Sequence, residues 1–294
     1  MFKNKLLCLF IFALFCAGGL KAQPCLNSWQ YRVPVNVNST SALTDLQIVI
    51  ENLNTSTLIA NAKLLITGAD LRFLDANGTV LPHWVESGTF NTANTKVWIK
   101  VPSISAGNTT IYMFYGNTAA NFIENGAATF EVFDGFTGNS IDGSIWHSCQ
   151  LNSGNISVAG GNLTLSNVTT PDKAGLVSAS TFSSPVRAEM SAVNVSASSK
   201  KTYLGLLNGS DNGYSMNYED NGISTTVVPQ NTTSAGASCV GFSSLFAPNN
   251  VTRSSGSVNG IWQLSWIAAG VQSFNWPGAS NIENITDPTY SLPT

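Results

Sequence analysis

The sequence predicts an all-β protein built from two β-sandwich domains. Short runs rich in β-branched and aromatic residues recur along the chain, and Gly, Asn, Asp and Pro interrupt them, which is the pattern of strands and turns. No apolar periodicity of 3.6 residues extends over a useful length after the first 22 residues, so helices are not expected as main elements. The roughly 270 residues that remain are enough for two cores of ordinary domain size.

Six strands are expected in the first domain, which we place at residues 27–125. The clearest alternation puts Val97 and Ile99 on one face and Trp98 on the other. Residues 75–78, Asp-Ala-Asn-Gly, are typical of a turn between two strands, because Asn and Gly tolerate positive φ. The expected strands are 30–36, 46–51, 70–74, 80–85, 96–101 and 109–115.

A polar stretch of small residues, 116–128, is typical of a linker, and the second domain is expected at residues 129–294. Its predicted strands are short and widely spaced, which favours a sandwich or jelly roll. A turn at 268–270 is expected to join the last two strands into a hairpin. The expected strands are 162–165, 174–178, 186–195, 202–207, 214–219, 261–267 and 271–276.

Residues 1–22 predict export. Lys3 and Lys5 precede an apolar run at 6–15, and small residues then lead to Ala22, as in a secretory signal peptide. The run is shorter than the roughly 20 apolar residues of a membrane-spanning helix. We therefore expect a secreted, periplasmic or cell-surface protein that has no transmembrane segment once the signal is cleaved.

The charge balance excludes nucleic acid as a partner. Removing Lys3, Lys5 and Lys21 with the signal leaves 10 basic against 16 acidic residues, a net charge of −6. Nucleic-acid binding needs a basic surface, and none is indicated. Charged residues make up only 10% of the chain, so Asn, Ser, Thr and Gly carry the polarity, which is common in extracellular β proteins.

Three cysteines remain after export: Cys25, Cys149 and Cys239. Export favours oxidation, and Cys149 and Cys239 both fall in the second domain, so we predict a disulfide between them. The alternative is three free buried thiols, and the role of Cys25 stays open. Lipid attachment at Cys25 is not expected, because Pro24 precedes it in place of a small residue. Neither the cysteines nor the two histidines have the spacing of metal ligands.

Five separated blocks in the first half follow the order of one bacterial family. They are WQYRVPVNV at 29–37, GADLRFLDANG at 68–78, LPHWVE at 81–86, KVWIKVP at 96–102 and IYMFYGN at 111–117. Together they resemble the family called domain of unknown function 2341. The resemblance implies a β-sandwich module of secreted or surface proteins, often set before other extracellular domains. The activity of that family is not settled.

The segment FDGFTGNSIDGSIW at 133–146 resembles the start of concanavalin A-like lectin and glucanase (LamG-like) jelly rolls. Such a jelly roll normally closes with a further Trp-bearing strand, whereas this chain stops at 290–294, so we expect the second domain to be incomplete. Jelly rolls of this kind often hold a structural calcium ion in this segment, and the resemblance would place it near Asp134 and Asp142. Two aspartates do not make a site, and no other cofactor is expected.

No catalytic site is expected, and we predict that the protein is not an enzyme. Jelly-roll glycoside hydrolases place two carboxylates on one strand so that they flank the scissile bond. Glu189 has Ser191 two residues on, and the adjacent Glu219 and Asp220 would face opposite sides of a strand, so they are expected to cap a turn. A glycoside hydrolase is therefore the least favoured function.

Two pairs of titratable residues in the first domain could also be interpreted as parts of a functional site. His83 and Glu86 are three residues apart and face opposite sides of a strand, so a structural role is favoured over an acid–base couple. Asp70 and Arg72 share a strand face, and a salt bridge that stabilises the sandwich is favoured over a binding site.

The leading hypothesis is carbohydrate binding or adhesion through the second domain. Tyr214 and Tyr218 alternate onto one face, where aromatic rings can stack on the sugar rings of a glycan or cell-surface polysaccharide. The equally weighted alternative is that this face is the inner one and the tyrosines are core, as is expected for Trp262 and Trp266. The alternative function is a purely structural spacer of a larger surface protein.

Overall fold

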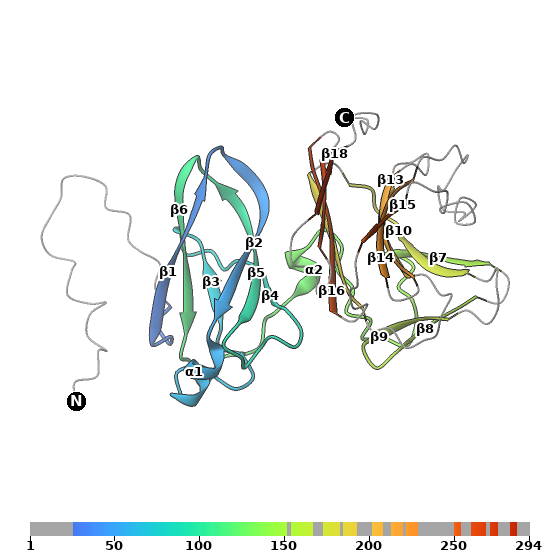
Figure 1. Ribbon diagram of the computed structural model, residues 1–294. Helices are drawn as coiled ribbons and strands as arrows, with labels where there is room; N and C mark the ends of the chain where they lie inside the picture. Colours follow the sequence, from blue (N-terminus) through green and yellow to red (C-terminus); the bar gives the residue numbers. More distant parts are fainter. Residues whose placement is uncertain are drawn as a thin grey trace, which may run out of the picture. The chain divides into compact units, whose positions relative to one another are not determined.

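The computed structural model shows an all-β protein, as predicted, and divides the chain into two compact units, Met1–Asp134 and Gly135–Thr294 (Figure 1). The structure describes residues 26–151, 154–166, 173–182, 185–192, 202–207, 213–219, 222–228, 250–253, 260–268, 271–275 and 283–286. The predicted signal peptide and Cys25 lie outside these residues. No described helix has the length and apolar character needed to cross a membrane.

The first unit is a sandwich of two three-stranded antiparallel sheets, with strand orders β1-β6-β3 and β2-β5-β4. All six predicted strands are present, with shifted ends. Their bounds are β1 Tyr31–Ser39, β2 Leu43–Leu53, β3 Arg72–Leu74, β4 His83–Val85, β5 Thr95–Ile104 and β6 Gly107–Tyr115. The β-sandwich predicted for the first domain is therefore confirmed.

The core of this sandwich lies between the two sheets. Val97 and Ile99 of β5 are fully buried, and Phe73 of β3 and Ile111 of β6 meet them from the opposite sheet. Burial of each such side chain stabilises the fold by about 1.5–3 kcal/mol. The alternation seen in the sequence thus identifies the inner face correctly, because successive side chains of a strand point to opposite faces.

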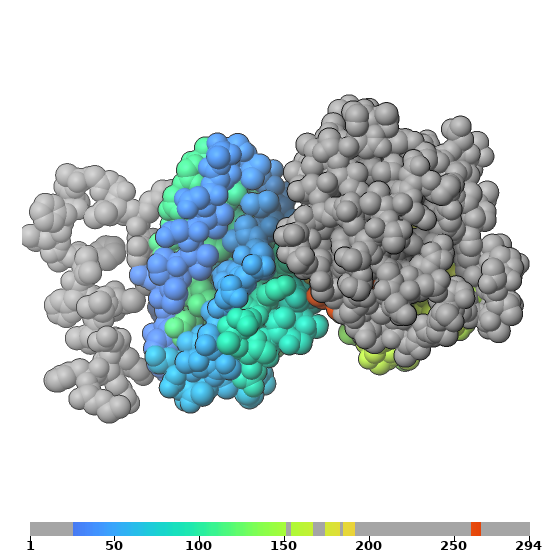
Figure 2. All heavy atoms as spheres, viewed as in Figure 1, coloured from blue at the N-terminus to red at the C-terminus, as the bar shows by residue number. Residues whose placement is uncertain are grey.

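A short helix, α1 (Thr55–Ala60), closes one end of the sandwich and was not predicted from the sequence. Asn54 caps it by accepting a hydrogen bond from the Thr57 backbone at 2.9 Å. The Ser56 amide bonds to the Thr92 carbonyl at 3.2 Å, so α1 and the loop after β4 lie side by side at this end (Figure 2). Six residues are too few to give a helical periodicity in the sequence.

The predicted turn at 75–78 is present, and Leu74 and Val80 form an antiparallel bridge across it, but the chain then passes to the opposite sheet. The Asp75 carboxylate accepts hydrogen bonds from the Asn77 and Thr79 amides, both at 2.8 Å, and Gly78 has φ +88°. The Leu81 amide still bonds to the Phe73 carbonyl of β3, which pairs with β6, whereas β4 pairs with β5, so the chain crosses the sandwich between Leu81 and His83. Turn residues fix a reversal of the chain, but they do not say which sheet the next strand joins.

The predicted linker at 116–128 is not a free connection but part of the first unit. It includes a second short helix, α2 (Gly126–Thr129), and the rings of Phe130 and Phe133 follow it. Trp84 contacts both rings edge to face, at centroid distances of 5.6 and 5.1 Å. We call residues 116–133 the strap. The prediction of a linker was wrong because the strap is held by backbone hydrogen bonds and by the two Phe rings at its end, which the polar composition does not reveal.

The strap begins at Gly116, which has φ +88° and lies under the ring of Tyr31. A Cβ atom at this position would come within 2.6 Å of that ring. Gly116→Ala should therefore lower the free energy of unfolding by about 2 kcal/mol, measured by urea denaturation. Gly107→Ala is the matched control, because Gly107 has φ +91° but open space around it, so its loss should be about half as large. Equal losses would contradict the role of the Tyr31 contact.

The described residues of the second unit form two four-stranded antiparallel sheets and two two-stranded ladders. One sheet orders β11 (Val186–Ala192), β16 (Gly260–Ala268), β17 (Val271–Asn275) and β18 (Glu283–Thr286); the other orders β12 (Thr202–Leu207), β13 (Gly213–Glu219), β14 (Gly222–Val228) and β15 (Asn250–Arg253). The ladders pair β7 (Trp146–Leu151) with β10 (Lys173–Ser178) and β8 (Asn155–Ala159) with β9 (Asn162–Ser166). The seven predicted strands are all present, and β7, β8, β14, β15 and β18 were missed.

Two local predictions for this unit are confirmed. β16 and β17 pair antiparallel as expected, and Trp262 of β16 is fully buried. β13 and β14 pair antiparallel with Glu219 opposite Gly222, whereas the predicted turn residue Asp220 lies outside the described residues. The concanavalin A-like jelly roll and the incomplete C-terminus stay predictions.

Candidate binding pocket

The residues predicted as sites in the second unit are only partly described. Tyr214 and Tyr218 lie on β13, but their side chains are outside the described part of the structure, so their exposure is untested. Cys149 is buried and disulfide-bonded, whereas Cys239 falls outside the described residues, so their pairing stays a prediction. The Asp142 carboxylate accepts hydrogen bonds from the amide and hydroxyl of Ser144.

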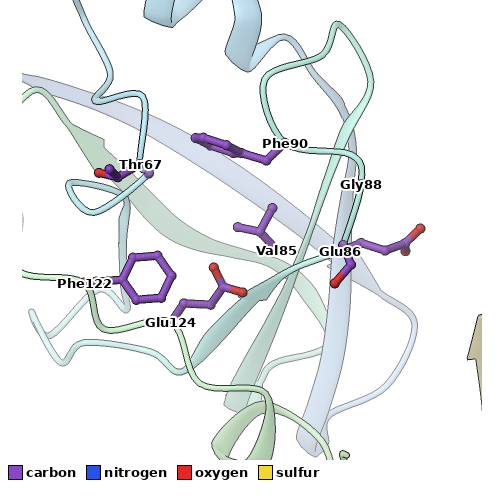
Figure 3. Close-up of a pocket in the computed structure, with 9 residues that line it drawn as sticks. Thr67, Val85, Glu86, Gly88, Phe90, Phe122 and Glu124 are labelled. Atoms are coloured by element: carbon purple, nitrogen blue, oxygen red, sulfur yellow. The ribbon is translucent and has the colours of Figure 1, made fainter. Parts of the chain in front are cut away.

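A pocket of about 150 Å³ opens on the first unit (Figure 3). Three segments form it: the turn after α1, the loop after β4, and the middle of the strap. Phe90 and Phe122 present their rings to it, Val85 lies between them, and the carboxylate of Glu124 points inward (Figure 3). The lining residues are Thr67, Gly68, Val85, Glu86, Ser87, Gly88, Phe90, Phe122 and Glu124.

The apolar wall of the pocket continues onto the surface. Phe122 is 58% exposed, and two residues adjacent in sequence to lining residues, Ile123 beside Phe122 and Ile66 beside Thr67, are exposed as well. Large apolar side chains are normally exposed one at a time, and a group of them around a concave site is typical of a binding surface.

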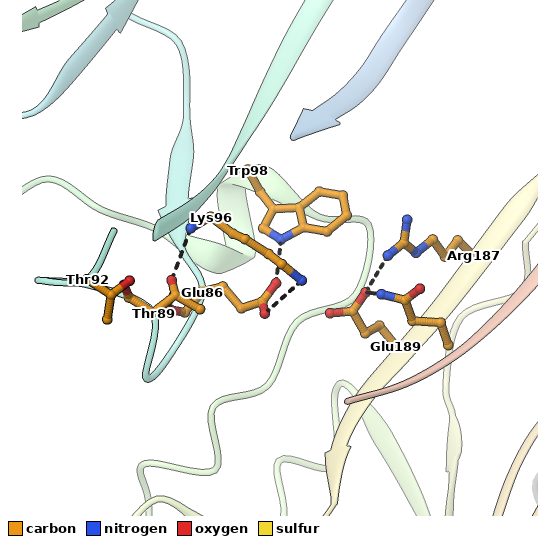
Figure 4. A network of polar contacts seen from close by, with 8 residues as sticks. Glu86, Thr89, Thr92, Lys96, Trp98, Arg187 and Glu189 are labelled. Carbon is orange, nitrogen blue, oxygen red and sulfur yellow. Dashed lines mark hydrogen bonds and ion pairs between the residues drawn. The ribbon is translucent and has the colours of Figure 1, made fainter. Parts of the chain in front are cut away.

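The two carboxylates of the pocket differ in their partners. Glu86 is buried, and its carboxylate is bonded to Lys96 at 3.4 Å and to the indole N–H of Trp98 at 3.3 Å (Figure 4). No basic side chain among the described residues forms an ion pair with Glu124. Burial raises the pKa of the Glu124 carboxyl, and a hydrogen bond from the Val85 backbone partly opposes this by lowering it. Glu124 is therefore the acidic group that remains available to a ligand.

Asp70 holds two of the segments that form the pocket in place. Its carboxylate is buried and accepts three backbone hydrogen bonds, from Leu65 at 3.0 Å, Gly116 at 2.8 Å and Asn117 at 3.3 Å. The first fixes the turn that carries Thr67, and the other two fix the start of the strap. The predicted salt bridge with Arg72 is not among the ion pairs of the described residues, because backbone N–H groups already satisfy the carboxylate.

Arg72 and His83 hold the strap on either side of Phe122 and Glu124. The buried Arg72 guanidinium donates to the carbonyls of Ala69 and Leu71, both at 2.7 Å, and to the Asn121 carbonyl of the strap. The His83 carbonyl accepts the Asn125 amide at 3.0 Å. Hydrogen bonds at Asn121 and Asn125 thus fix the 122–124 segment on both sides, which keeps this wall of the pocket in place.

The side chain of His83 is buried in the core of the first unit. It is 2% exposed, contacts the ring of Phe73 edge to face, and has an Nδ1 atom with no hydrogen-bond partner among the described residues. Desolvation, with a further effect of the Arg72 charge, lowers the pKa of His83 to about 4. Among the described residues no hydrogen bond joins it to Glu86, whose carboxylate accepts the indole N–H of Trp98.

A network of threonines fixes the loop that carries Phe90. The buried hydroxyls of Thr55 and Thr95 lie 2.6 Å apart, and the Thr55 hydroxyl accepts the Asn91 amide at 3.0 Å. Thr89 donates to the Glu86 carbonyl at 2.7 Å and accepts the Lys96 amide at 3.1 Å (Figure 4). Satisfied buried hydroxyls of this kind give a loop one defined conformation.

The part of the chain that the structure describes contains no cluster of three or more metal-ligating side chains. Glu189 of β11 is paired with Arg187 at 2.8 Å and with Gln263 at 3.0 Å.

Residues 67–149 match the model of a family described as Domain of unknown function (DUF2341). The DUF2341 match contains every residue that lines the pocket. It begins after the block at 29–37 and extends past the boundary at Asp134. It therefore includes the segment 133–146, which we had assigned to a jelly roll by resemblance. Searches of curated proteins and of solved structures found no significant match.

Sequence reasoning found the framework of the pocket but missed its lining. Asp70, Arg72, His83 and Glu86 were all singled out, and each is buried. Phe122 and Glu124 were overlooked because they fall in the supposed linker. The one available signal was the pair Phe122–Ile123 inside a polar stretch, since adjacent large apolar residues are unusual in a free linker.

Proposed function

We propose that this chain is an exported binding or adhesion module that recognises carbohydrate. The observation that carries the proposal is the pocket of the first unit, in which the rings of Phe90 and Phe122 flank the available carboxylate of Glu124. The predicted signal peptide supports a place outside the cytoplasmic membrane. The conceivable calcium ion is not needed by this proposal.

The chemistry of the pocket suits a sugar. The apolar faces of a sugar ring stack on aromatic side chains, and its hydroxyl groups donate hydrogen bonds that a carboxylate accepts. Ligand sites for drug-sized molecules measure about 300–1,000 Å³, so a cavity of about 150 Å³ has room for one sugar unit and not for a long chain. The module would therefore bind a chain end or a single exposed unit.

The second domain offers a further candidate site. Tyr214 and Tyr218 fall on one face of β13, as they would in a sugar-stacking surface, and we keep them as part of the proposal. A structural spacer without a ligand is the competing function, and the same experiment separates the two.

A glycan-array screen of residues 23–294 tests the proposal. Phe122→Ala should weaken binding about tenfold, because the stacking surface is lost, and Glu124→Gln should weaken it by removal of the charged acceptor. Phe182→Ala is the matched control, since Phe182 is exposed in the second unit, away from the pocket residues in sequence. Tyr214→Ala and Tyr218→Ala are screened alongside.

The outcomes are distinct. Loss of binding in the Phe122 and Glu124 variants supports the pocket, and loss only in the tyrosine variants moves the site to the second domain. A folded chain that binds no glycan on the array contradicts the proposal and favours the spacer.

A further inference from the structure

The charge of the pocket points to a more specific ligand. Of the two carboxylates in its lining, Glu86 is neutralised by Lys96, whereas Glu124 forms no ion pair among the described residues. Glu124 nevertheless faces into the cavity between Val85 and Phe122 (Figure 3). A half-buried carboxylate has lost part of its hydration, and an opposite charge placed beside it restores that stabilisation.

We infer that the pocket takes a hexosamine unit with a free amine, its ammonium group at the Glu124 carboxylate and its ring against Phe122. This inference rests on the proposed carbohydrate binding and names the sugar class. Burial, which raises the pKa of Glu124, also strengthens the attraction between the carboxylate and a cation, because solvent screens the pair less. An N-acetylated sugar has no such cation.

The aromatic rings favour the same ligand. An ammonium group within about 6 Å of an aromatic face is attracted to it electrostatically, and Phe90 and Phe122 border the space beside Glu124. Phe122 is also 58% exposed, so much of its ring is accessible for stacking on a sugar ring. A lysine side chain carries the same ammonium group but presents no ring to stack on Phe122.

Isothermal titration of residues 23–294 with a glucosamine tetramer and with its fully N-acetylated counterpart tests the inference. We expect the free-amine tetramer to bind at least tenfold more tightly, and Glu124→Gln to remove that difference. Glu131→Gln is the matched control: Glu131 is an exposed carboxylate bonded to Lys100, so this variant should keep the preference. Unchanged thermal unfolding of the variants shows that each is folded.

Failure of the inference differs from failure of the proposed function. Equal or tighter binding of the N-acetylated tetramer, lost in Phe122→Ala, overturns the ammonium assignment but retains the sugar site. A lysine peptide that binds more tightly than the free-amine tetramer overturns the sugar as occupant. Binding of neither tetramer overturns the inference, and the array then decides the proposed function separately.

Discussion

Asp70→Ala is expected to lower the free energy of unfolding of the first unit by about 4 kcal/mol. The buried carboxylate accepts hydrogen bonds from the amides of Leu65, Gly116 and Asn117, and its removal is expected to leave these donors unsatisfied. An unsatisfied buried donor costs about 1–3 kcal/mol. Asp70→Asn should lose about 2 kcal/mol, because its oxygen can accept from the two strap amides but its NH2 group then faces the Leu65 N–H, which loses its acceptor.

Urea denaturation with hydrogen exchange of residues 65–71 and 112–117 measures the effect and assigns it to the first unit. Asp75→Asn is the matched control. Asp75 also accepts two backbone amides, but they are those of its own exposed turn, and an asparagine oxygen can replace the carboxylate there. That variant should lose less than about 1 kcal/mol. Comparable losses for Asp70→Asn and Asp75→Asn would show that Asp70 has no special anchoring role.

The Asp70 variants also test how the pocket is built. Because the carboxylate joins the turn before Thr67 to the start of the strap, its loss should separate these walls even where the sandwich stays folded. Glycan binding by Asp70→Asn is then expected to fall at temperatures well below its unfolding transition. Full binding up to that transition would show that the walls are held by other contacts.

The second large effect is a loss of stability in acid that comes from His83. Its pKa is lowered to about 4 in the folded protein, whereas the pKa of an unfolded histidine is about 6.5. Between these values the unfolded chain binds a proton that the folded chain does not. The stability that His83 contributes is therefore complete above about pH 6.5 and is lost as the pH falls toward about 4, in total about 3 kcal/mol.

Urea denaturation between pH 3.5 and pH 8 measures this dependence. In His83→Leu the acid-dependent loss should be reduced by about 3 kcal/mol relative to the unchanged chain, because the residue no longer titrates. His83→Gln serves as a second non-titrating variant if leucine perturbs the contact with Phe73. His147→Gln is the matched control and should keep the dependence. A different result would contradict the burial of a neutral His83: the acid-dependent loss of stability disappears in His147→Gln and is unchanged in both His83 variants.

Protonation of His83 should also loosen the strap that forms one wall of the pocket. His83 lies on β4, and its carbonyl holds the Asn125 amide next to Glu124. Protonation of its ring would place a second cation near the buried Arg72, which already lowers the pKa of His83. Local opening of the strap is therefore expected before global unfolding, as faster hydrogen exchange at 121–126 below about pH 5.

By itself, the sequence determined the fold class, the first-domain strands and the inner face of the sandwich. These follow from local rules, since β-branched alternation and turn residues act over a few positions. The buried polar residues Asp70, Arg72 and His83 also stood out, because charged and titratable groups are rare inside such patterns. The short helices α1 and α2 left no periodicity to detect.

Only the tertiary structure decided what those residues do. Asp70 was expected to pair with Arg72, but the fold brings backbone N–H groups 46 and 47 residues away to its carboxylate instead. The linker became a strap for a similar reason: many of its anchors are backbone amides and carbonyls, which every residue has and no sequence pattern marks. The pocket of Phe90, Phe122 and Glu124 arises where three distant segments meet, so it became visible only when long-range contacts placed them together.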